Sequence, residues 1–178
     1  MIFSPFNYTN DKHDYSYFKI LIMKSTKENN IDTLNDLIKI NNDRVAGYEK
    51  AIQLTSDEDA DLKTLFNSMI NESREYGSEL TNFVNSLGES DTPTGTRADG
   101  KIYRAWMSVR STFSGKDRRS VLASCEGGED AAQRAYESAL KEDLEDDATH
   151  LVTEQKNKLR QSHDKIKALR DMQHAEHH

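Results

Sequence analysis

Residues 56–88 of the chain read SDEDADLKTLFNSMINESREYGSELTNFVNSLG. Their apolar members recur at three- and four-residue steps, which puts them on one face of a helix: Leu62, Leu65, Phe66, Met69, Tyr76, Leu80, Phe83, Val84 and Leu87. Ser56 can cap free amides at the start, the acids after it suit the positive end of a helix dipole, and Gly88 can end the helix in a left-handed conformation. The stretch therefore predicts an amphipathic helix over about residues 57–86.

The same spacing continues on both sides of this helix. Apolar residues between Leu34 and Ile52 predict a first helix over about residues 31–54. Residues 101–140 predict a third helix that is bent or broken at Ser114-Gly115. An acidic group at residues 142–147 then precedes a fourth helix, whose apolar face ends near Leu169. The sequence thus indicates four long helices.

The connection between the second and third helices is long. Residues 89–100 contain Pro93, Gly95 and Gly100, which are typical of a loop. About a dozen extended residues cover roughly 40 Å, enough to return along the length of a bundle, so the third helix is expected to run parallel to the second. Four helices joined by two short turns and one long crossover have the topology of a ferritin-like four-helix bundle.

The two ends of the chain fall outside this pattern. Residues 1–29 mix aromatic side chains with Asn, Asp and Lys without a sustained period, so we expect an N-terminal extension that is disordered or packed as a strap. Met23 is a candidate for the native start. We assign residues 30–174 to the four-helix-bundle domain and residues 175–178 to a C-terminal tail.

Composition narrows the class of protein. The 178 residues are 35% hydrophobic and 31% charged with only 8 Gly and 2 Pro, which suits one helical domain. A net charge of −7 disfavours nucleic-acid binding, and no stretch approaches the roughly 20 apolar residues of a membrane span. The single Cys125 cannot form an internal disulfide, which fits the cytoplasm, and its place on an apolar stripe favours a core residue over a nucleophile.

Polar residues interrupt the apolar stripes. The second helix carries Glu72, the third carries Glu129, and the fourth carries Gln155 and His163 where the period expects an apolar side chain. A buried carboxylate needs a partner, a proton or a metal. One interpretation is a metal site with ligands Glu72, Glu129 and His163, in which Glu126 and Gln155 contact the ligands and orient them. The other is a hydrogen-bonded layer that fixes helix register, or side chains that reach water at the edge of the stripe.

A standard di-iron centre is not expected from these residues. Such a centre takes one Glu from each of two helices and a Glu-x-x-His pair from each of the other two. The chain has no Glu-x-x-His, and its nearest analogues, Asp147 with His150 and Asp171 with His174, fall at the ends of the fourth helix.

Short motifs between Thr33 and Asp171 resemble those of one protein family. They are Leu34-Asn35-Asp36-Leu37-Ile38, Gly47-Tyr48, Leu65-Phe66, Glu79-Leu80, Leu87-Gly88, Arg104 with Trp106, Cys125-Glu126-Gly127-Gly128-Glu129-Asp130, Ala135-Tyr136, His163-Asp164 and Leu169-Arg170-Asp171. In these motifs the chain resembles an uncharacterised bacterial family of ferritin-like four-helix-bundle proteins, a domain of unknown function. The residues from Glu126 to Asp130 resemble the family's Glu-Arg-Gly-Glu-Asp signature, with Gly127 in place of Arg. Tyr103 stands where many members have His, and Gln53 where many have Glu. The resemblance implies a ferritin-like fold and a bacterial cytosolic protein, and it brings no established reaction.

Three functions agree with these observations. The leading hypothesis is a non-enzymatic bundle that self-associates as a homo-oligomer, without a cofactor, in a stress-related or interaction role. Apolar residues off the main stripes, such as Ile70 and Trp106, and the aromatic N-terminal segment motivate the self-association. The second hypothesis is a metal-binding ferritin relative with a non-standard carboxylate and histidine site for di-iron or another transition metal. The third is a bundle whose interior binds a small apolar molecule.

Overall fold

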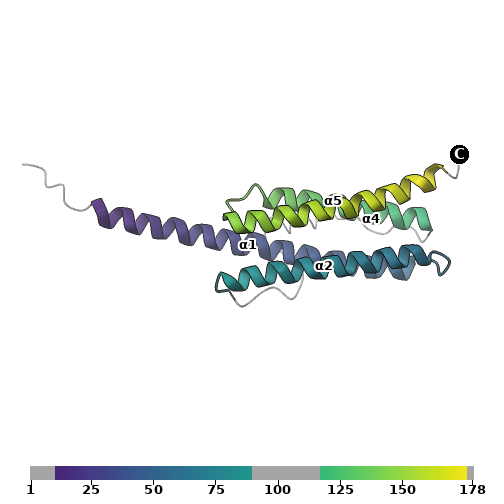
Figure 1. The fold of residues 1–178 in the computed structure, drawn as a ribbon, viewed down its shortest axis with the longest axis horizontal. Coiled ribbons are helices and arrows are strands. Elements are labelled where there is room, and N and C mark those ends of the chain that lie inside the picture. The colour runs from purple at the N-terminus through teal and green to yellow at the C-terminus, as the bar shows by residue number, and fades with distance from the viewer. Residues whose placement is uncertain (1–10, 90–116, 176–178) are drawn as a thin grey trace, which may run out of the picture.

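The chain folds into long helices that lie side by side (Figure 1). The computed structural model describes residues 11–89 and 117–175. Within these ranges the helices are α1 (Asp11–Leu54), α2 (Ala60–Ser86), α4 (Arg118–Ala139) and α5 (Asp146–Ala175), and no strand is present. The all-α fold expected from the periodicity is confirmed. No helix in the described ranges is both long and apolar enough to cross a membrane.

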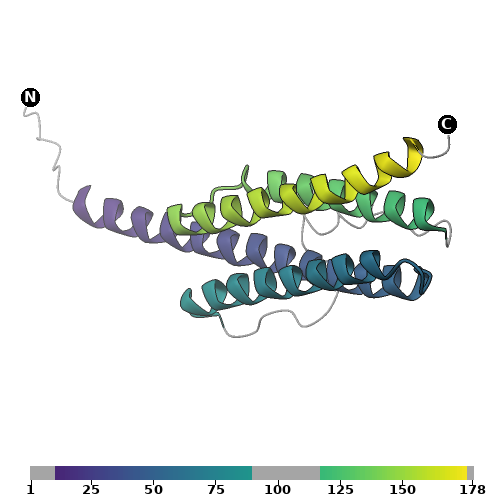
Figure 2. The ribbon, with the colours of Figure 1, turned by 45° about the vertical axis from the view of Figure 1, so that its right-hand side comes forward.

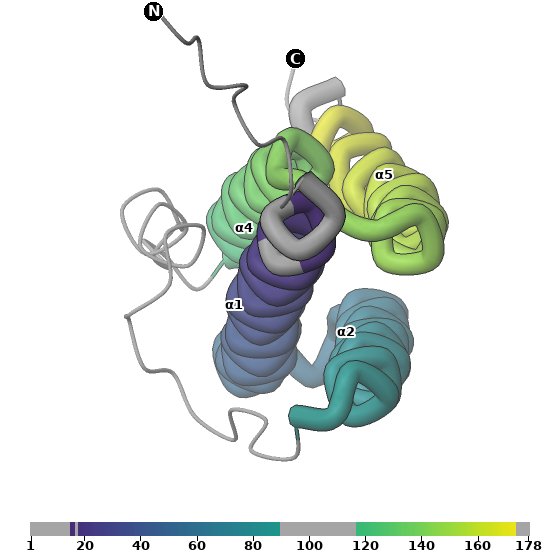
Figure 3. The backbone as a smooth tube through the Cα atoms, turned by 90° about the vertical axis from the view of Figure 1, so that its left-hand side faces the viewer, coloured from purple at the N-terminus to yellow at the C-terminus, as the bar shows by residue number. Residues whose placement is uncertain are grey.

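The helices form two hairpins that pack on each other. α1 packs against α2 and α4, and α5 packs against α4 and α2 (Figures 2 and 3). α2 and α4 run in the same direction, because Arg118 at the start of α4 contacts Asp59 and Asp61 at the start of α2. The parallel course expected from the long connection is therefore confirmed. The predicted crossover and the predicted bend at Ser114-Gly115 lie in residues 90–116, outside the described residues.

Two apolar clusters fill the space between the hairpins. The first lies toward the α4–α5 turn and includes Leu34, Leu37, Ile40, Tyr76, Leu80, Tyr136 and Leu159. The second lies toward the α1–α2 turn and includes Tyr48, Phe66, Met69, Leu122, Cys125 and Ile166. In each described helix, polar residues lie between the residues of the two clusters. They are Arg44 on α1, Glu72 and Ser73 on α2, Glu129 on α4 and Ser162 on α5. The core is therefore two apolar blocks separated by a layer of polar side chains.

The ends of α2 show one confirmed prediction and one correction. Gly88 has a φ of 85°, so it ends α2 in the left-handed conformation expected of it. α2 begins at Ala60 rather than at residue 57, with Asp59 at its N-cap and no side-chain bond in the cap. Ser56 instead accepts a hydrogen bond from the backbone N–H of Glu58 at 3.3 Å. Its hydroxyl orders the turn before the helix.

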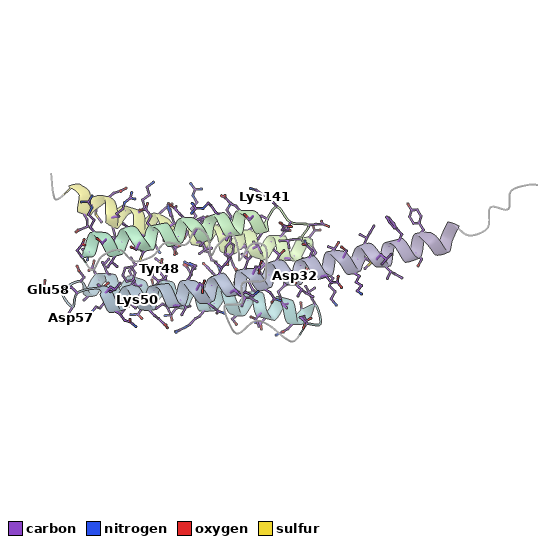
Figure 4. All side chains as sticks on the ribbon, turned by 180° about the vertical axis from the view of Figure 1, so that it is seen from behind. Asp32, Tyr48, Lys50, Asp57, Glu58 and Lys141 are labelled. Atoms are coloured by element: carbon purple, nitrogen blue, oxygen red, sulfur yellow. The ribbon has the colours of Figure 1, made fainter. Side chains whose placement is uncertain are left out.

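The beginning of α1 differs most from expectation. α1 begins at Asp11 instead of residue 31, so residues 11–29 are helical rather than disordered or packed as a strap. The segment before Asp32 extends past the α4–α5 turn that carries Lys141 (Figure 4). Residues 18–25 are exposed, so no described helix packs on them, and their sequence shows no sustained three- and four-residue period.

Candidate functional site

The polar layer is built around Arg44 of α1 and comprises Arg44, Glu72, Ser73, Glu129 and Ser162. Each of the four helices in the described part of the chain contributes at least one of these residues. Arg44 continues the core-facing stripe of α1 one turn after Ile40, so its guanidinium enters the bundle interior, where it is buried. Glu129 is also buried, with 1% of its surface exposed. The layer therefore pairs opposite charges inside the bundle, with Arg44 and Glu129 buried and Glu72 partly buried.

Arg44 and Glu129 make the central contact of the layer. The Nη2 and Nε atoms of Arg44 donate to Oε1 of Glu129 at 2.8 Å and 3.3 Å. The hydroxyl of Tyr48, one turn after Arg44, donates to the same oxygen. Tyr48 lies between α1 and α4 (Figure 4). Three donors from α1 therefore converge on one carboxylate oxygen of α4.

Glu72 joins the layer from α2. Its Oε1 accepts from Nη2 of Arg44 at 3.3 Å, and its Oε2 accepts from the hydroxyl of Ser162 on α5 at 2.7 Å. Arg44 also donates through Nη1 to the hydroxyl of Ser73 at 2.9 Å. One guanidinium thus contacts both carboxylates, and every helix is tied to a neighbour through polar atoms.

The electrostatics keep the layer in one charge state. Burial by itself lowers the pKa of Arg44, but the attraction of Glu129 and Glu72 outweighs it and raises that pKa, so the guanidinium stays charged. Burial and the charge of Glu129 raise the pKa of Tyr48 and of Cys125, so the phenol and the thiol stay protonated. A buried, protonated thiol is a poor nucleophile, which agrees with the interpretation of Cys125 as a core residue.

A second set of polar side chains crosses the first apolar cluster, and we call it the Tyr136 chain. The amide of Asn41 donates to the Tyr136 hydroxyl at 2.8 Å, and that hydroxyl donates to Oε1 of Gln155 at 2.9 Å. Gln155 in turn donates to Glu79 Oε2 at 2.7 Å and to the carbonyl of Tyr76 at 3.3 Å. The Tyr136 chain links α1, α4, α5 and α2 in that order.

Some buried polar atoms near these two sets have no hydrogen-bond partner. They include Oε2 of Glu129, Oδ1 of Asn41 and the hydroxyl of Tyr76. Glu129 therefore uses one oxygen for three donors and leaves the other unpaired. An unpaired buried oxygen costs free energy, so Glu129 is the residue of the layer best able to accept a further donor or a cation.

The structure separates the residues predicted from sequence into two groups. Glu72 and Glu129 meet on Arg44, and Gln155 takes part in the Tyr136 chain. His163 has other partners: its ring nitrogens lie 3.1 Å from Asp130 and 3.0 Å from Asp164. Glu126 pairs with Arg170 near the end of α5. The structure thus brings Glu72 and Glu129 together and places His163 in a different contact between α4 and α5.

Sequence reasoning missed Arg44, Tyr48 and Ser73. Each of them lies on an apolar stripe of its helix, and Arg44 follows Leu37 and Ile40 at helical spacing. That spacing was the available signal, because two buried acidic side chains need partners, and an arginine on a third stripe can donate to both. An arginine is usually interpreted as a surface residue, so its position on the stripe is the stronger guide.

Comparison with known proteins identifies the family. Residues 29–142 match the profile of a domain of unknown function, DUF2383. The chain belongs to the DUF2383 family. A search of curated proteins gives no match. Among solved structures, the chain is similar to a mutant of Dps1 from Mycobacterium smegmatis, with 15% sequence identity and a TM-score of 0.73 over 82% of this chain and 97% of that chain. This likeness shows that the DUF2383 chain has a ferritin-like four-helix-bundle fold.

A ferritin-like bundle can hold two metal ions between carboxylates and histidines. In residues 11–89 and 117–175, no group of three or more His, Cys, Asp or Glu side chains is arranged to hold a metal ion. The two carboxylates at the centre share the guanidinium of Arg44. The described residues do not fit a di-iron centre, because the guanidinium of Arg44 lies between the carboxylates of Glu72 and Glu129.

Proposed function

We propose that this DUF2383 protein is a non-enzymatic helical bundle that acts by self-association in the cytoplasm. The observation that carries the proposal is the N-terminal part of α1, where large apolar side chains between Tyr15 and Met23 are exposed to solvent. Soluble proteins rarely leave several neighbouring large apolar side chains exposed without a partner. An exposed apolar helix at one end of a stable bundle suits an interaction role better than catalysis.

The polar layer supports the same proposal. Its carboxylates have Arg44, Tyr48 and Ser162 as partners, and Oε2 of Glu129 is the one carboxylate oxygen of the layer left unpaired. A buried, hydrogen-bonded charge network can specify one helix register. We therefore interpret Arg44, Glu72 and Glu129 as residues that hold the four helices in alignment and so keep α1 in a defined position.

Light scattering of the full chain tests the proposal. The weight-average mass is measured between about 1 and 100 µM, a range that covers ordinary protein–protein affinities. We expect a mass above the 20.3 kDa of one chain at the higher concentrations. A mass of one chain throughout this range would overturn self-association.

Glu129 supports a second candidate, a non-standard metal site. Its Oε2 is buried and unpaired, and it could become a ligand together with Glu72 and His163, with Glu126 and Gln155 as supporting residues. This candidate requires Arg44 to leave the carboxylates and His163 to leave Asp130, after which one transition-metal ion could bind. Metal analysis after incubation with iron, manganese or zinc tests it. A stoichiometric metal that is lost in Glu129→Ala would favour this candidate, and no bound metal under any of these conditions would remove it.

A further inference from the structure

The polar layer has the arrangement of a metal site in a helical bundle, but it contains a cation of its own. In ferritin-like di-iron bundles, each of the four helices directs a carboxylate or histidine ligand inward. Here α2 directs Glu72, α4 directs Glu129 and α5 directs the hydroxyl of Ser162 into the layer. α1 contributes Arg44, a cation, where that arrangement has a ligand. One helix therefore supplies the positive charge that a metal ion would bring.

Each nitrogen of the Arg44 guanidinium has an acceptor in the layer. Nη2 donates to Oε1 of Glu129 at 2.8 Å and to Oε1 of Glu72 at 3.3 Å. Nη1 donates to the Ser73 hydroxyl at 2.9 Å, and Nε donates to Oε1 of Glu129 at 3.3 Å. The ring of Tyr48 lies beside the cation, with its centroid 5.9 Å from Cζ of Arg44. The layer is thus complementary to a planar guanidinium in charge and in hydrogen-bond geometry.

The position of Arg44 conflicts with a metal ion bound to the same two carboxylates. Nη2 of Arg44 contacts one oxygen of Glu72 and one oxygen of Glu129, so it takes the place from which a metal ion would bridge them. Two cations at this separation inside a protein repel each other strongly. Arg44 and Glu129 are both buried, so water does little to screen that repulsion. The guanidinium and a metal ion therefore exclude each other from the layer.

We propose that the polar layer is a binding site for a guanidinium group, with the side chain of Arg44 as its permanent occupant in place of a metal ion. Because Arg44 is part of the chain, it binds without the loss of translational freedom that a dissolved cation suffers. Without its side chain, the layer keeps two carboxylates and the Ser73 hydroxyl, and it should bind a free guanidinium ion. This inference concerns the interior of one chain, so it does not depend on the proposed self-association.

Chemical rescue of Arg44→Ala tests the inference. The melting temperature Tm of the full chain is followed by circular dichroism while guanidinium chloride is added from about 1 to 50 mM, with sodium chloride at the same ionic strength as the reference. Relative to wild type, we expect the Tm of Arg44→Ala to rise and level off. At about tenfold the dissociation constant the rise should be on the order of 3–6 °C, since the ligand binds only the folded state. The wild-type chain should show no rise, because its site is occupied.

Urea is the matched control for the guanidinium ion. It has a similar planar shape and similar N–H donors but carries no charge, so it cannot balance the two carboxylates. At these concentrations its denaturing effect is small and linear. We expect urea to leave the Tm of Arg44→Ala without a rise. No rise with guanidinium, or a rise of equal size with urea or with sodium chloride, would overturn the guanidinium site.

Two double variants locate the bound ion and extend the test to the case in which Arg44→Ala does not fold. Arg44→Ala with Glu72→Gln has one buried carboxylate fewer to leave unpaired, and it keeps Glu129, which accepts from two guanidinium nitrogens. We expect guanidinium to raise its Tm. Arg44→Ala with Glu129→Gln loses that carboxylate and should need about tenfold more guanidinium for half of its rise. An equal response of the two double variants, or no recovery of folding or Tm in Arg44→Ala and in its Glu72→Gln derivative, would overturn the inference.

Metal analysis of the wild-type chain separates this inference from a metal site. The chain is incubated with iron, manganese or zinc, and the metal that stays bound through gel filtration is measured. We expect none in the layer, because Arg44 occupies it. A stoichiometric metal ion that is lost in Glu129→Ala would overturn the inference, since Arg44 would not be the permanent occupant. A monomeric wild-type chain together with rescue of Arg44→Ala would support the inference and overturn self-association.

Discussion

The Nη2 atom of Arg44 lies 2.8 Å from Oε1 of Glu129, and both side chains are buried between α1 and α4. This pair sits between two apolar clusters, so the core of the bundle has an internal cation as well as internal carboxylates. The contact defines which turn of α1 faces which turn of α4. Arg44 and Glu129 therefore join the two hairpins through a buried ion pair.

Replacement of Arg44 by Met tests how much the positive charge of Arg44 contributes to the stability of the bundle. Arg44→Met leaves Glu72 and Glu129 close together without a counter-charge. Removal of one partner of a buried ion pair typically costs about 3–5 kcal/mol. We expect a loss of this size in the free energy of unfolding, measured by urea denaturation followed by circular dichroism.

The double variant Arg44→Met with Glu129→Leu is the control for this prediction. It removes both charges of the central pair, so it should recover a large part of the stability lost in Arg44→Met. If the double variant were as unstable as the sum of the two single variants, the two side chains would not be energetically coupled, and the role assigned to the pair would be wrong.

The Tyr136 chain gives a prediction with a matched control. Tyr136→Phe removes a hydroxyl that bonds Asn41 and Gln155 and leaves those groups without it, which should cost about 1–3 kcal/mol. Tyr76→Phe removes a buried hydroxyl that has no partner, so it should be neutral or slightly stabilising. Thermal unfolding of the two variants, side by side, measures the difference. Equal destabilisation would show that the Tyr136 hydroxyl bonds contribute nothing beyond packing.

The N-cap of α4 links stability to pH. Asp117 accepts from the backbone N–H of Ser120 at 3.0 Å and from the Ser120 hydroxyl at 2.6 Å, and these bonds lower the pKa of Asp117 from its usual value of 3.8. Asp117→Ala should cost about 1 kcal/mol at neutral pH. A lowered folded-state pKa stabilises the fold above the unfolded value and loses that effect as the pH falls through the folded value. The difference between wild type and Asp117→Ala should therefore shrink below about pH 3.8.

Urea midpoints at a series of pH values check this prediction. Asp32→Ala, which removes an exposed carboxylate of α1, is the control for a simple change of charge. A gap between wild type and Asp117→Ala that stays constant from neutral pH down to acid would contradict the capping role.

Arg118 joins the starts of α2 and α4 and gives a salt-dependent prediction. It donates to Asp59 at 2.6 Å and to both oxygens of Asp61 at 2.9 Å and 2.6 Å. Because these groups are partly exposed, we expect Arg118→Ala to cost only about 1 kcal/mol, and less at high salt. The free energy of unfolding of Arg118→Ala is measured at low salt and at about 1 M salt, with Arg160→Ala, at an exposed position of α5, as the reference. A loss that does not change with salt would indicate packing of the arginine stem instead.

Sequence reasoning predicted the parts of the fold that depend on a two-sided core. The stripe of α2, its end at Gly88 and the parallel course of α4 followed from apolar spacing and loop length, and the structure confirms them. The predicted start of α1 at residue 31 was wrong, since α1 begins at Asp11, and its residues 18–25 are exposed and carry no sustained period. The burial of Glu129 was predicted as a break in a stripe. The pairing of Glu129 with Arg44 was not predicted, because it depends on which turn of α1 lies opposite which turn of α4.

Native mass spectrometry of the full chain, prepared with and without added iron, manganese and zinc, tests whether the protein acts by self-association or by binding a metal. It reports subunit number and bound metal in the same spectrum. We expect a complex of more than one 20.3 kDa chain, with a mass that contains no metal under any of these conditions. A single chain at all concentrations, or a stoichiometric metal adduct that disappears in Glu129→Ala, would contradict it.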